Sequence, residues 1–421
     1  MKISVAFLAL VLAAACAPEQ PVSEASRSPV TSTLEAKSWR LEPPVAIASP
    51  AGDRAGEPFL LPDGKGGLYL SWIERGEESR AAVKMSRFDG SAWSAPVTIV
   101  ERDDLFVNWA DFPSIFLLND GSIVAHWLQK SGAGTYAYDV MLARSTDGGA
   151  TWSEPVIAHD DGTESEHGFA SFAQAEGDEG FELVWLDGRE MTGDGHGHGS
   201  GDMTLRWASF NPDLTMRAGR VLDARVCECC QTSMVMTDDG PVVAYRDRSD
   251  EEVRDIGFMH RAGTTWSEPA IVHPDGWQIN ACPVNGPQLD ARGRDVAVAW
   301  ATGAGGDFKV KAAFSTDAGA TWSAPVEVDG ASPAGRVDLV LLDSSTALVT
   351  WLATGEGSAT VRTRLVRREG AAGEPLVVGE TGSSRSSGFP RTALAGDRVY
   401  YAWTQPGDAS RILISSVKVG S

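Results

Sequence analysis

Short apolar segments that end in an aromatic residue recur along the chain at a nearly constant spacing. Seven of them can be aligned on that aromatic, which is Trp72, Trp127, Trp185, Tyr245, Trp300, Trp351 and Trp403. Successive aromatics are 55, 58, 60, 55, 51 and 52 residues apart. Each segment is bounded by turn residues, which is typical of a β-strand. Self-similarity at such a period predicts one repeat architecture rather than several unrelated domains.

A second marker lies between these strands. It reads STDGGATWSEPV at 145–156 and STDAGATWSAPV at 315–326, with weaker copies at 86–97 and 260–270. In the full copies we expect the Asp to accept backbone N–H bonds inside its own turn, while the Gly two residues later permits a positive φ. This pattern is the Asp-box, and over roughly residues 38–421 the chain resembles the sialidase-like BNR-repeat β-propellers. The resemblance implies that the boxes are structural and not catalytic.

The two ends of the chain predict how the repeat closes. The stretch SWRLEPPVAIA at 38–48 looks like the strand that follows a box, and Trp39 precedes Trp72 by 33 residues, the offset found in a full-box repeat. The last repeat stops at Ser421, before a box strand of its own. We therefore expect an all-β, seven-bladed β-propeller whose N-terminal strand joins the last blade and leaves no exposed sheet edge. Sialidases have six blades, so this departure weakens any transfer of their activity.

The N-terminus reads as an export signal. One Lys, an apolar run and small residues precede Cys16, and the run is too short to span a membrane. LAAAC resembles a bacterial lipoprotein signal in which Cys16 is lipidated, although Ala13 stands where that family usually has Leu; Ala17 after the Cys implies sorting to the outer membrane. A plain periplasmic product is the alternative. The expected regions are a signal peptide at 1–15, a flexible tether at 16–37 and a single propeller domain at 38–421.

The balance of charges narrows the possible partners. The formal net charge is −21 and the pI is about 4.7. Because like charges repel, binding of nucleic acid or of an anionic membrane surface through bulk electrostatics is excluded. The sequence contains no Gly-rich phosphate loop and no Gly-x-Ser-x-Gly elbow.

Candidate site residues can be found by aligning the repeats on the aromatic residue. The resemblance implies that the position eighteen residues upstream lies at the mouth of the central channel, on the face opposite the Asp-boxes. At that level the seven repeats place Arg54, Trp109, His167, Cys227, Cys282, Pro333 and Arg385. Three successive blades thus offer His, Cys and Cys.

Further sulfur and imidazole groups are expected at the same mouth. RVCECCQT at 225–232 adds Cys229 and Cys230, and the loop after Trp185 adds two histidines. Thiolate and imidazole are the ligands that soft and borderline metals prefer. The sequence therefore predicts a copper or zinc site with the ligand candidates His167, His196, His198, Cys227, Cys229, Cys230 and Cys282.

Two other uses of the cysteines stay open. Cysteines of an exported protein tend to form disulfides. A bridge between the adjacent Cys229 and Cys230 would be strained, so a bridge from Cys227 or Cys230 to Cys282 is the more favourable pairing. Inert or redox-active thiols are the remaining possibility.

Polar residues near the mouth suggest binding of a substrate instead. The candidates are Arg54, Arg246, Asp247, Arg248, Asn285, Arg385 and Arg391. An arginine can fork onto a carboxylate or phosphate, but YRDRSDEEVRD at 245–255 can equally be an ion-pair network that stiffens its loop. The sialidase resemblance implies three arginines that hold the sugar carboxylate, an Asp that acts as acid/base and a Tyr nucleophile that is activated by a Glu. The early Arg-Ile-Pro signature is missing here, and Glu57 stands where its arginine would fall.

Three functions follow from these patterns. The first is a lipid-anchored protein of the bacterial cell envelope that faces the periplasm from the outer membrane. It would bind copper or zinc at the channel mouth, on the face opposite the Asp-boxes. The second is an exo-sialidase-type glycoside hydrolase or a glycan-binding module. The third is a scaffold for a protein partner. Whether the protein is an enzyme is left open, because fold alone cannot choose among these functions.

Overall fold

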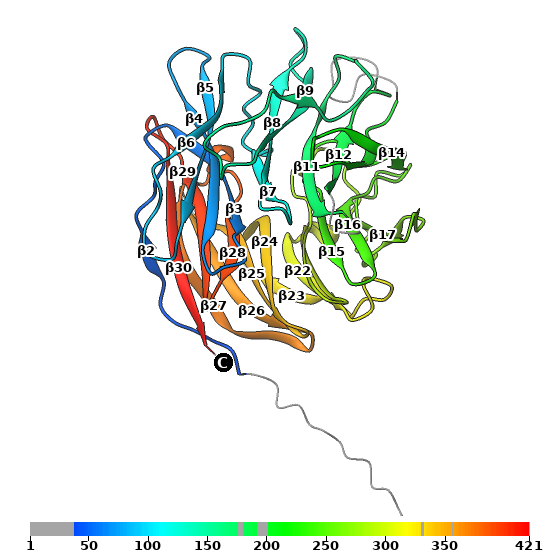
Figure 1. The fold of residues 1–421 in the computed structure, drawn as a ribbon. Coiled ribbons are helices and arrows are strands. Elements are labelled where there is room, and N and C mark those ends of the chain that lie inside the picture. Colours follow the sequence, from blue (N-terminus) through cyan, green and yellow to red (C-terminus); the bar gives the residue numbers. More distant parts are fainter. Residues whose placement is uncertain (1–37, 176–179, 192–200, 330–331, 356, 421) are drawn as a thin grey trace, which may run out of the picture. The chain divides into compact units, whose positions relative to one another are not determined.

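The computed structural model describes residues 38–420 except 176–179, 192–200, 330–331 and 356. Within it, the described residues from Trp39 onward form one compact unit. Seven antiparallel sheets follow one another around a ring, and each sheet is built from strands consecutive in the chain, apart from the sheet that joins the two ends (Figure 1). The predicted seven-bladed β-propeller is confirmed.

Each blade has four strand positions, counted outward from the channel. The first strands are β3 (Ala55–Pro62), β7 (Ser114–Leu117), β11 (His167–Gln174), β15 (Ser233–Thr237), β20 (Gln288–Arg292), β24 (Pro333–Asp343) and β28 (Arg391–Ala395). The second strands are β4 (Leu68–Arg75), β8 (Ile123–Lys130), β12 (Phe181–Asp187), β16 (Gly240–Arg246), β21 (Asp295–Thr302), β25 (Thr346–Thr354) and β29 (Arg398–Gln405). The third strands are β5 (Ala81–Phe88), β9 (Tyr138–Ser145), β13 (Thr204–Phe210), β17 (Ile256–Ala262), β22 (Lys309–Ser315), β26 (Ala359–Arg367) and β30 (Arg411–Gly420). The outer strands are β6 (Val97–Arg102), β10 (Val156–Ile157), β14 (Met216–Asp223), β18 (Thr265–Trp266), β19 (Ala270–Ile271), β23 (Val326–Asp329) and β27 (Gly370–Thr381).

The ring closes through the N-terminal strands. β1 (Arg40–Leu41) and β2 (Val45–Ile47) both pair antiparallel with β30, which lies at the other end of the chain (Figure 1). This pairing supplies the fourth strand position of the last blade and covers the edge that β30 would otherwise expose. The closure predicted from the ends of the sequence is therefore confirmed.

The hydrophobic core lies between neighbouring blades. The repeated aromatics fill it, and Trp72, Trp300 and Trp351 are almost completely buried. The first strands pack against one another around the channel, for example β11 on β15 and β15 on β20. Because each blade buries one face against the next, the ring is stabilised only as a whole.

The Asp-boxes form the turns expected of them. Asp147 accepts the backbone N–H of Thr151 at 2.9 Å, and Asp317 accepts that of Thr321 at 2.9 Å. Gly149 has a φ of 97°, and a Cβ there would approach Met85 of the preceding blade to 3.1 Å. A larger residue would be strained at this position.

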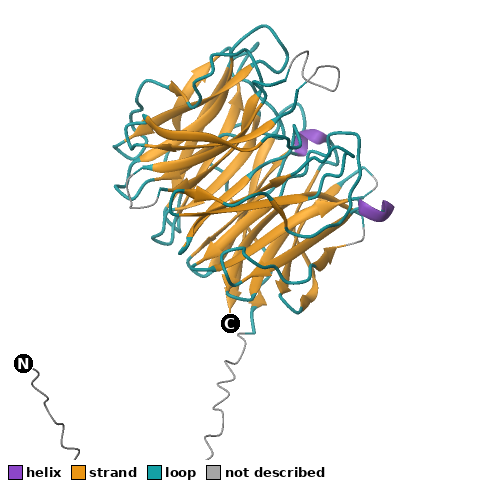
Figure 2. Ribbon diagram, turned by 90° about the vertical axis from the view of Figure 1, so that its right-hand side faces the viewer, coloured by secondary structure: helices purple, strands orange, loops and turns teal. Residues whose placement is uncertain are grey.

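Strands make up nearly all the regular structure (Figure 2). In the described residues the only helical pieces are the short 3-10 turns η1 (Ala304–Gly306) and η2 (Arg385–Ser387). No helix in this part of the chain is long and apolar enough to cross a bilayer.

Candidate functional site

The loops that lead into the first strands gather at one end of the ring. His167 and Pro333 begin β11 and β24, and the other five residues of the predicted level lie in the loops just before their first strands. The Asp-boxes follow the third strands, which run in the same direction as the first strands. Antiparallel order therefore puts the boxes at the opposite end. We call the end that carries His167 and Cys227 the top face.

Three thiols lie together on the top face of blade 4. The Sγ atom of Cys227 is 3.3 Å from that of Cys230 and 3.9 Å from that of Cys229. All three side chains are buried. The backbone N–H of Cys227 donates to the carbonyl oxygen of Arg246 at 3.0 Å, which ties their loop to the end of β16. We call Cys227, Cys229 and Cys230 the thiol cluster.

A buried arginine sets the charge of the thiol cluster. Arg254 Nη1 donates to Cys227 Sγ at 3.2 Å. Burial by itself would raise the pKa of Cys227, but hydrogen bonds from Cys229 and Cys230 and the charge of Arg254 hold that pKa well below its usual value. Burial and their hydrogen bonds to Cys227 raise the pKa values of Cys229 and Cys230. Cys227 is therefore the sulfur of the cluster that ionises most readily.

Cys282 on blade 5 joins the edge of the thiol cluster. Its thiol is exposed and donates to Glu228 Oε2 at 4.0 Å. The backbone N–H of Asn285 donates to Cys230 Sγ at 3.4 Å, so the loop of blade 5 rests on the cluster. The structure thus brings together the four cysteines that the sequence placed on neighbouring blades.

The four described cysteines are free thiols. The Sγ atoms of Cys227 and Cys230 are 3.3 Å apart, whereas a disulfide requires about 2.05 Å. The bridge from Cys227 or Cys230 to Cys282 that the sequence left open is not formed.

His167 does not lie with the sulfurs. Its Nδ1 donates to the carbonyl oxygens of Tyr138 and Ser165 at 3.2 and 3.1 Å, and its Nε2 is 3.2 Å from Asp161 Oδ2. The ring stacks on that of His159 with centroids 3.7 Å apart. The repeat level of His167 was predicted correctly, but its side chain points into the interface between blades 2 and 3. Equal level along a blade does not fix side-chain direction.

The imidazoles of His159 and His167 belong to a charge network. Asp139, Asp161 and Asp187 surround them at distances compatible with metal ligands. The guanidinium of Arg189 already supplies a positive charge to these carboxylates. Its Nε lies 2.8 Å from Asp187 Oδ1, and its Nη2 lies 3.3 Å from Asp161 Oδ1. We interpret this group as structural. The other predicted histidine ligands, His196 and His198, lie outside the described residues.

The side chain of Arg246 links two neighbouring blades by hydrogen bonds and does not face a ligand site. Its guanidinium is buried and donates to three backbone carbonyl oxygens, those of Arg254 at 2.6 Å, Asn285 at 2.7 Å and Ala301 at 2.8 Å. It also lies over the ring of Trp277 at 4.8 Å. Asn285 is engaged too, since its Oδ1 accepts the backbone N–H of Arg336. Both predicted substrate residues are therefore buried and engaged in contacts within the protein.

The other polar residues from the same loop form the predicted ion-pair network. Arg248 pairs with Glu252 at 2.6 Å and contacts Glu228, which also accepts Arg254 at 2.8 Å. Burial raises the pKa of Asp247 to about 6. These contacts stiffen the loop beside the thiol cluster.

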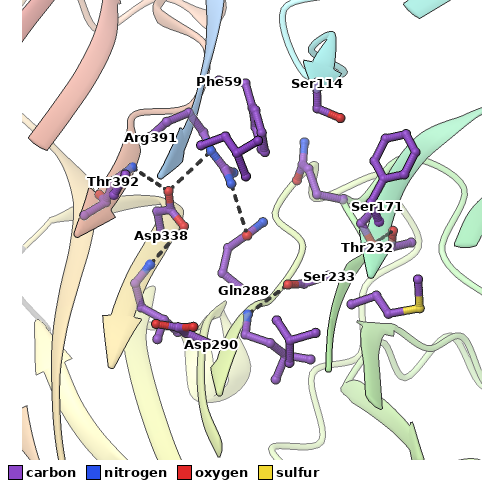
Figure 3. A pocket seen from close by; sticks show the side chains of 18 of the residues that line it. Phe59, Ser114, Ser171, Thr232, Ser233, Gln288, Asp290, Asp338, Arg391 and Thr392 are labelled. Atoms are coloured by element: carbon purple, nitrogen blue, oxygen red, sulfur yellow. Dashed lines mark hydrogen bonds and ion pairs between the residues drawn. The ribbon is translucent and has the colours of Figure 1, made fainter. Parts of the chain in front are cut away.

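The remaining predicted arginines do not converge. Arg54 and Arg385 are exposed in the loops before β3 and β28, on separate blades. Arg391 lies inside the central channel, in a cavity of about 460 Å³ lined by the first strands (Figure 3). There its Nε is 3.3 Å from Asp338 Oδ2, and its guanidinium lies over Phe112 at 4.7 Å. The channel therefore contains its own ion pair.

A Tyr–Glu pair that the sequence did not reveal lies beside the channel mouth. Tyr138 donates to Glu166 Oε1 at 2.7 Å, and burial raises the pKa of Glu166 to about 8. Tyr138 is completely buried, and its ring stacks on Phe106 with centroids 3.9 Å apart. A sugar cannot reach this phenol, so the pair does not form the exposed nucleophile of a sialidase. No sequence signal marked Glu166, because its contact depends on the packing of two blades.

Comparisons with known proteins bear on the fold alone. No known family model matches the chain, and no curated protein matches it. Among solved structures, a protein of unknown function from Dyadobacter fermentans is 16% identical with a TM-score of 0.54, over 91% of this chain and 99% of that one. The polysaccharide lyase Uly1 is 9% identical with a TM-score of 0.51, over 90% and 99%.

A mutant of the NanB sialidase from Streptococcus pneumoniae is also similar, at 10% identity and a TM-score of 0.46 over 89% of this chain and 94% of that one. The structural neighbours thus include sialidases and other propellers. The two structures with TM-scores above 0.5 show a similar fold, and at these identities no shared activity.

Proposed function

We propose that the thiol cluster binds a soft metal ion, with copper(I) as the favoured ion and zinc as the alternative. The observation that carries the proposal is the meeting of three buried sulfurs, Cys227, Cys229 and Cys230, whose sulfur atoms all lie within 4.8 Å of one another. Thiolate sulfur selects copper(I) and zinc over harder ions.

The spacing of the sulfurs supports this proposal. Metal–sulfur bonds of about 2.3 Å place the sulfurs of a tetrahedral or trigonal site about 3.8 to 4.0 Å apart. The two distances from Cys227 are 3.3 and 3.9 Å, so small movements of the side chains would accommodate an ion.

The charge of the surroundings also supports it. A buried site of three thiolates carries more negative charge than one metal ion removes, and the buried guanidinium of Arg254 offsets part of the excess. Cys229 and Cys230 must lose their protons when the ion binds, because only the thiolate is a strong ligand. Metal binding should therefore release protons from the cluster.

The sugar-directed alternative has less support. The predicted arginines are spread over different blades, and Arg246 is occupied by backbone carbonyl groups. The phenol of Tyr138 is sealed from solvent. The scaffold function has no specific observation in its favour.

We also propose, from the sequence alone, that the protein is a lipoprotein of the bacterial cell envelope. Lipidation of Cys16 would hold it in the outer membrane facing the periplasm. Such an anchored propeller would present the thiol cluster to ions of that compartment.

Anaerobic titration of the reduced protein with copper(I) tests the metal proposal. We expect one ion per chain, release of protons and a sulfur-to-copper charge-transfer band. In Cys227→Ser we expect the charge-transfer band to be absent and less than one copper ion to be bound per chain. His167→Gln is the matched control, because His167 lies in the separate charge network and its replacement should change neither.

Two results would count against the proposal. Reduced wild-type protein that retains neither copper nor zinc refutes it. Loss of metal in His167→Gln would restore the mixed Cys/His site of the sequence prediction and would refute the three-sulfur site.

A further inference from the structure

Access to the thiol cluster is restricted. Cys227 and Cys230 are each 1% exposed and Cys229 is 8% exposed. A soft ion that arrives on a carrier moves by ligand exchange, so the accepting sulfur must reach the ion while the carrier still holds it. The buried sulfurs cannot do this by themselves. A site that binds the ion well would exchange it slowly unless another ligand stands at the surface.

Cys282 is the exposed sulfur beside this site. Its thiol donates at 4.0 Å to Glu228, which lies in the chain between Cys227 and Cys229. Cys229 is the least buried member of the cluster and lies 3.9 Å from Cys227. An exposed sulfur of blade 5 therefore stands at the rim of three buried sulfurs of blade 4.

Packing between the two loops holds Cys282 in place. The backbone N–H of Gly286 donates to Gln231 Oε1 at 3.1 Å, and a Cβ at Gly286 would come within 2.0 Å of the Gln231 carbonyl oxygen. Only glycine permits this approach. Arg246 adds its bond to the Asn285 carbonyl oxygen at 2.7 Å. The exposed thiol thus belongs to a loop that is fixed to the thiol cluster at several points.

A carboxylate accepts the hydrogen bond of this exposed thiol. Cys282 donates to Glu228 Oε2 at 4.0 Å, and Arg254 and Arg248 hold the same carboxylate in position. Glu228 is itself only partly buried. It accepts the hydrogen bond of the Cys282 thiol at the rim of the cluster and so fixes the position of that sulfur.

We propose that Cys282 is the transfer ligand of the metal site, the sulfur that takes a copper(I) ion from a carrier and passes it to Cys229. This inference rests on the proposed function. In the first step the Cys282 thiol gives its proton to water, and its sulfur bonds to copper as one carrier ligand leaves. In the second step Cys229 loses its proton and replaces Cys282, which takes up a proton again. Copper stays in the +1 state, and no electron is transferred.

The chemistry also defines the carrier. It must present copper(I) on exposed soft ligands, such as thiolate or thioether groups, because only the edge of the site is open to it. A carrier that buries its ion could not bring it within reach of Cys282.

Transfer kinetics test this role. Copper(I) supplied as its bicinchoninate complex, and separately as its glutathione complex, would be mixed anaerobically with the full mature protein, and uptake followed by stopped-flow absorbance. For Cys282→Ser we expect an unchanged equilibrium affinity and a transfer rate lowered at least about tenfold. Cys282→Met should restore the rate, because a thioether is also a soft ligand.

The outcomes separate this role from the proposed function. An unchanged transfer rate in Cys282→Ser overturns it. Loss of affinity in Cys282→Ser to the degree seen in Cys227→Ser also overturns it, since Cys282 would then be a permanent fourth ligand while the metal site itself stands. Wild-type protein that takes up no metal from either complex refutes both.

Discussion

The buried carboxyl of Glu166 provides a test of the packing at the channel mouth. Burial raises its pKa to about 8, against 4.5 for an ordinary glutamic acid. Between these two values the folded protein keeps a proton that the unfolded chain has lost. The free energy of unfolding must therefore fall as the pH rises through this interval, by at most about 1.4 kcal/mol per pH unit from this residue. From pH 6 to pH 8 the loss should be about 2 kcal/mol.

Glu166→Gln removes the proton but keeps the oxygen that accepts the hydroxyl of Tyr138 at 2.7 Å. Its amide group has a cost in stability, but that cost does not depend on pH. The difference between wild type and Glu166→Gln in the free energy of unfolding should therefore shift by about 2 kcal/mol between pH 6 and pH 8, in favour of the variant at the higher pH. Urea unfolding followed by tryptophan fluorescence at each pH measures this difference.

Asp111→Asn is the matched control for this experiment. Burial raises the pKa of Asp111 to about 7, so its own difference from wild type should become constant about one pH unit earlier. A difference between wild type and Glu166→Gln that stays constant from pH 5 to pH 9 would refute the reasoning, because the carboxyl would then be ionised in the folded protein.

Three further changes have expected outcomes. Arg246→Met should lower the free energy of unfolding by about 3 to 5 kcal/mol, because three buried carbonyl groups lose their donor; a loss under about 1 kcal/mol in urea unfolding would mean that water replaces the guanidinium. Asp317→Ala should cost about 1 to 2 kcal/mol through its lost turn bonds, without any change in copper stoichiometry; altered metal binding would contradict the structural role of the box. Cys16→Ser should move the protein from the membrane fraction to the soluble periplasmic fraction, and a protein that stays with the membrane would contradict lipidation.

Much of the fold could be predicted because it is encoded locally. The aromatic strand ends such as Trp300, the Asp-box turns such as the one at Asp317, and the strand-like stretch at 38–48 each report a short segment with its own periodicity or turn chemistry. Counting those segments gave the number of blades. The ends of the chain then gave the closure that β1 and β30 form.

The candidate site was predicted only in part. Alignment on the repeat correctly put Cys227 and Cys282 on adjacent blades, because level in a blade follows from sequence distance. It misplaced His167, whose side chain turns toward Asp161. It also counted Arg246 as a substrate residue, although its partners are backbone carbonyl groups that no sequence pattern marks.

By itself, the sequence determined what depends on near neighbours: the strands, the turns, the repeat and the residue types available at the top face. Only the tertiary structure decided which of those residues meet. It separated His167 from the sulfurs, buried Tyr138 against Phe106 and set Arg254 on Cys227. The physical reason is that blade-to-blade packing sets the direction, burial and charged neighbours of each side chain, and these depend on residues far away in the chain.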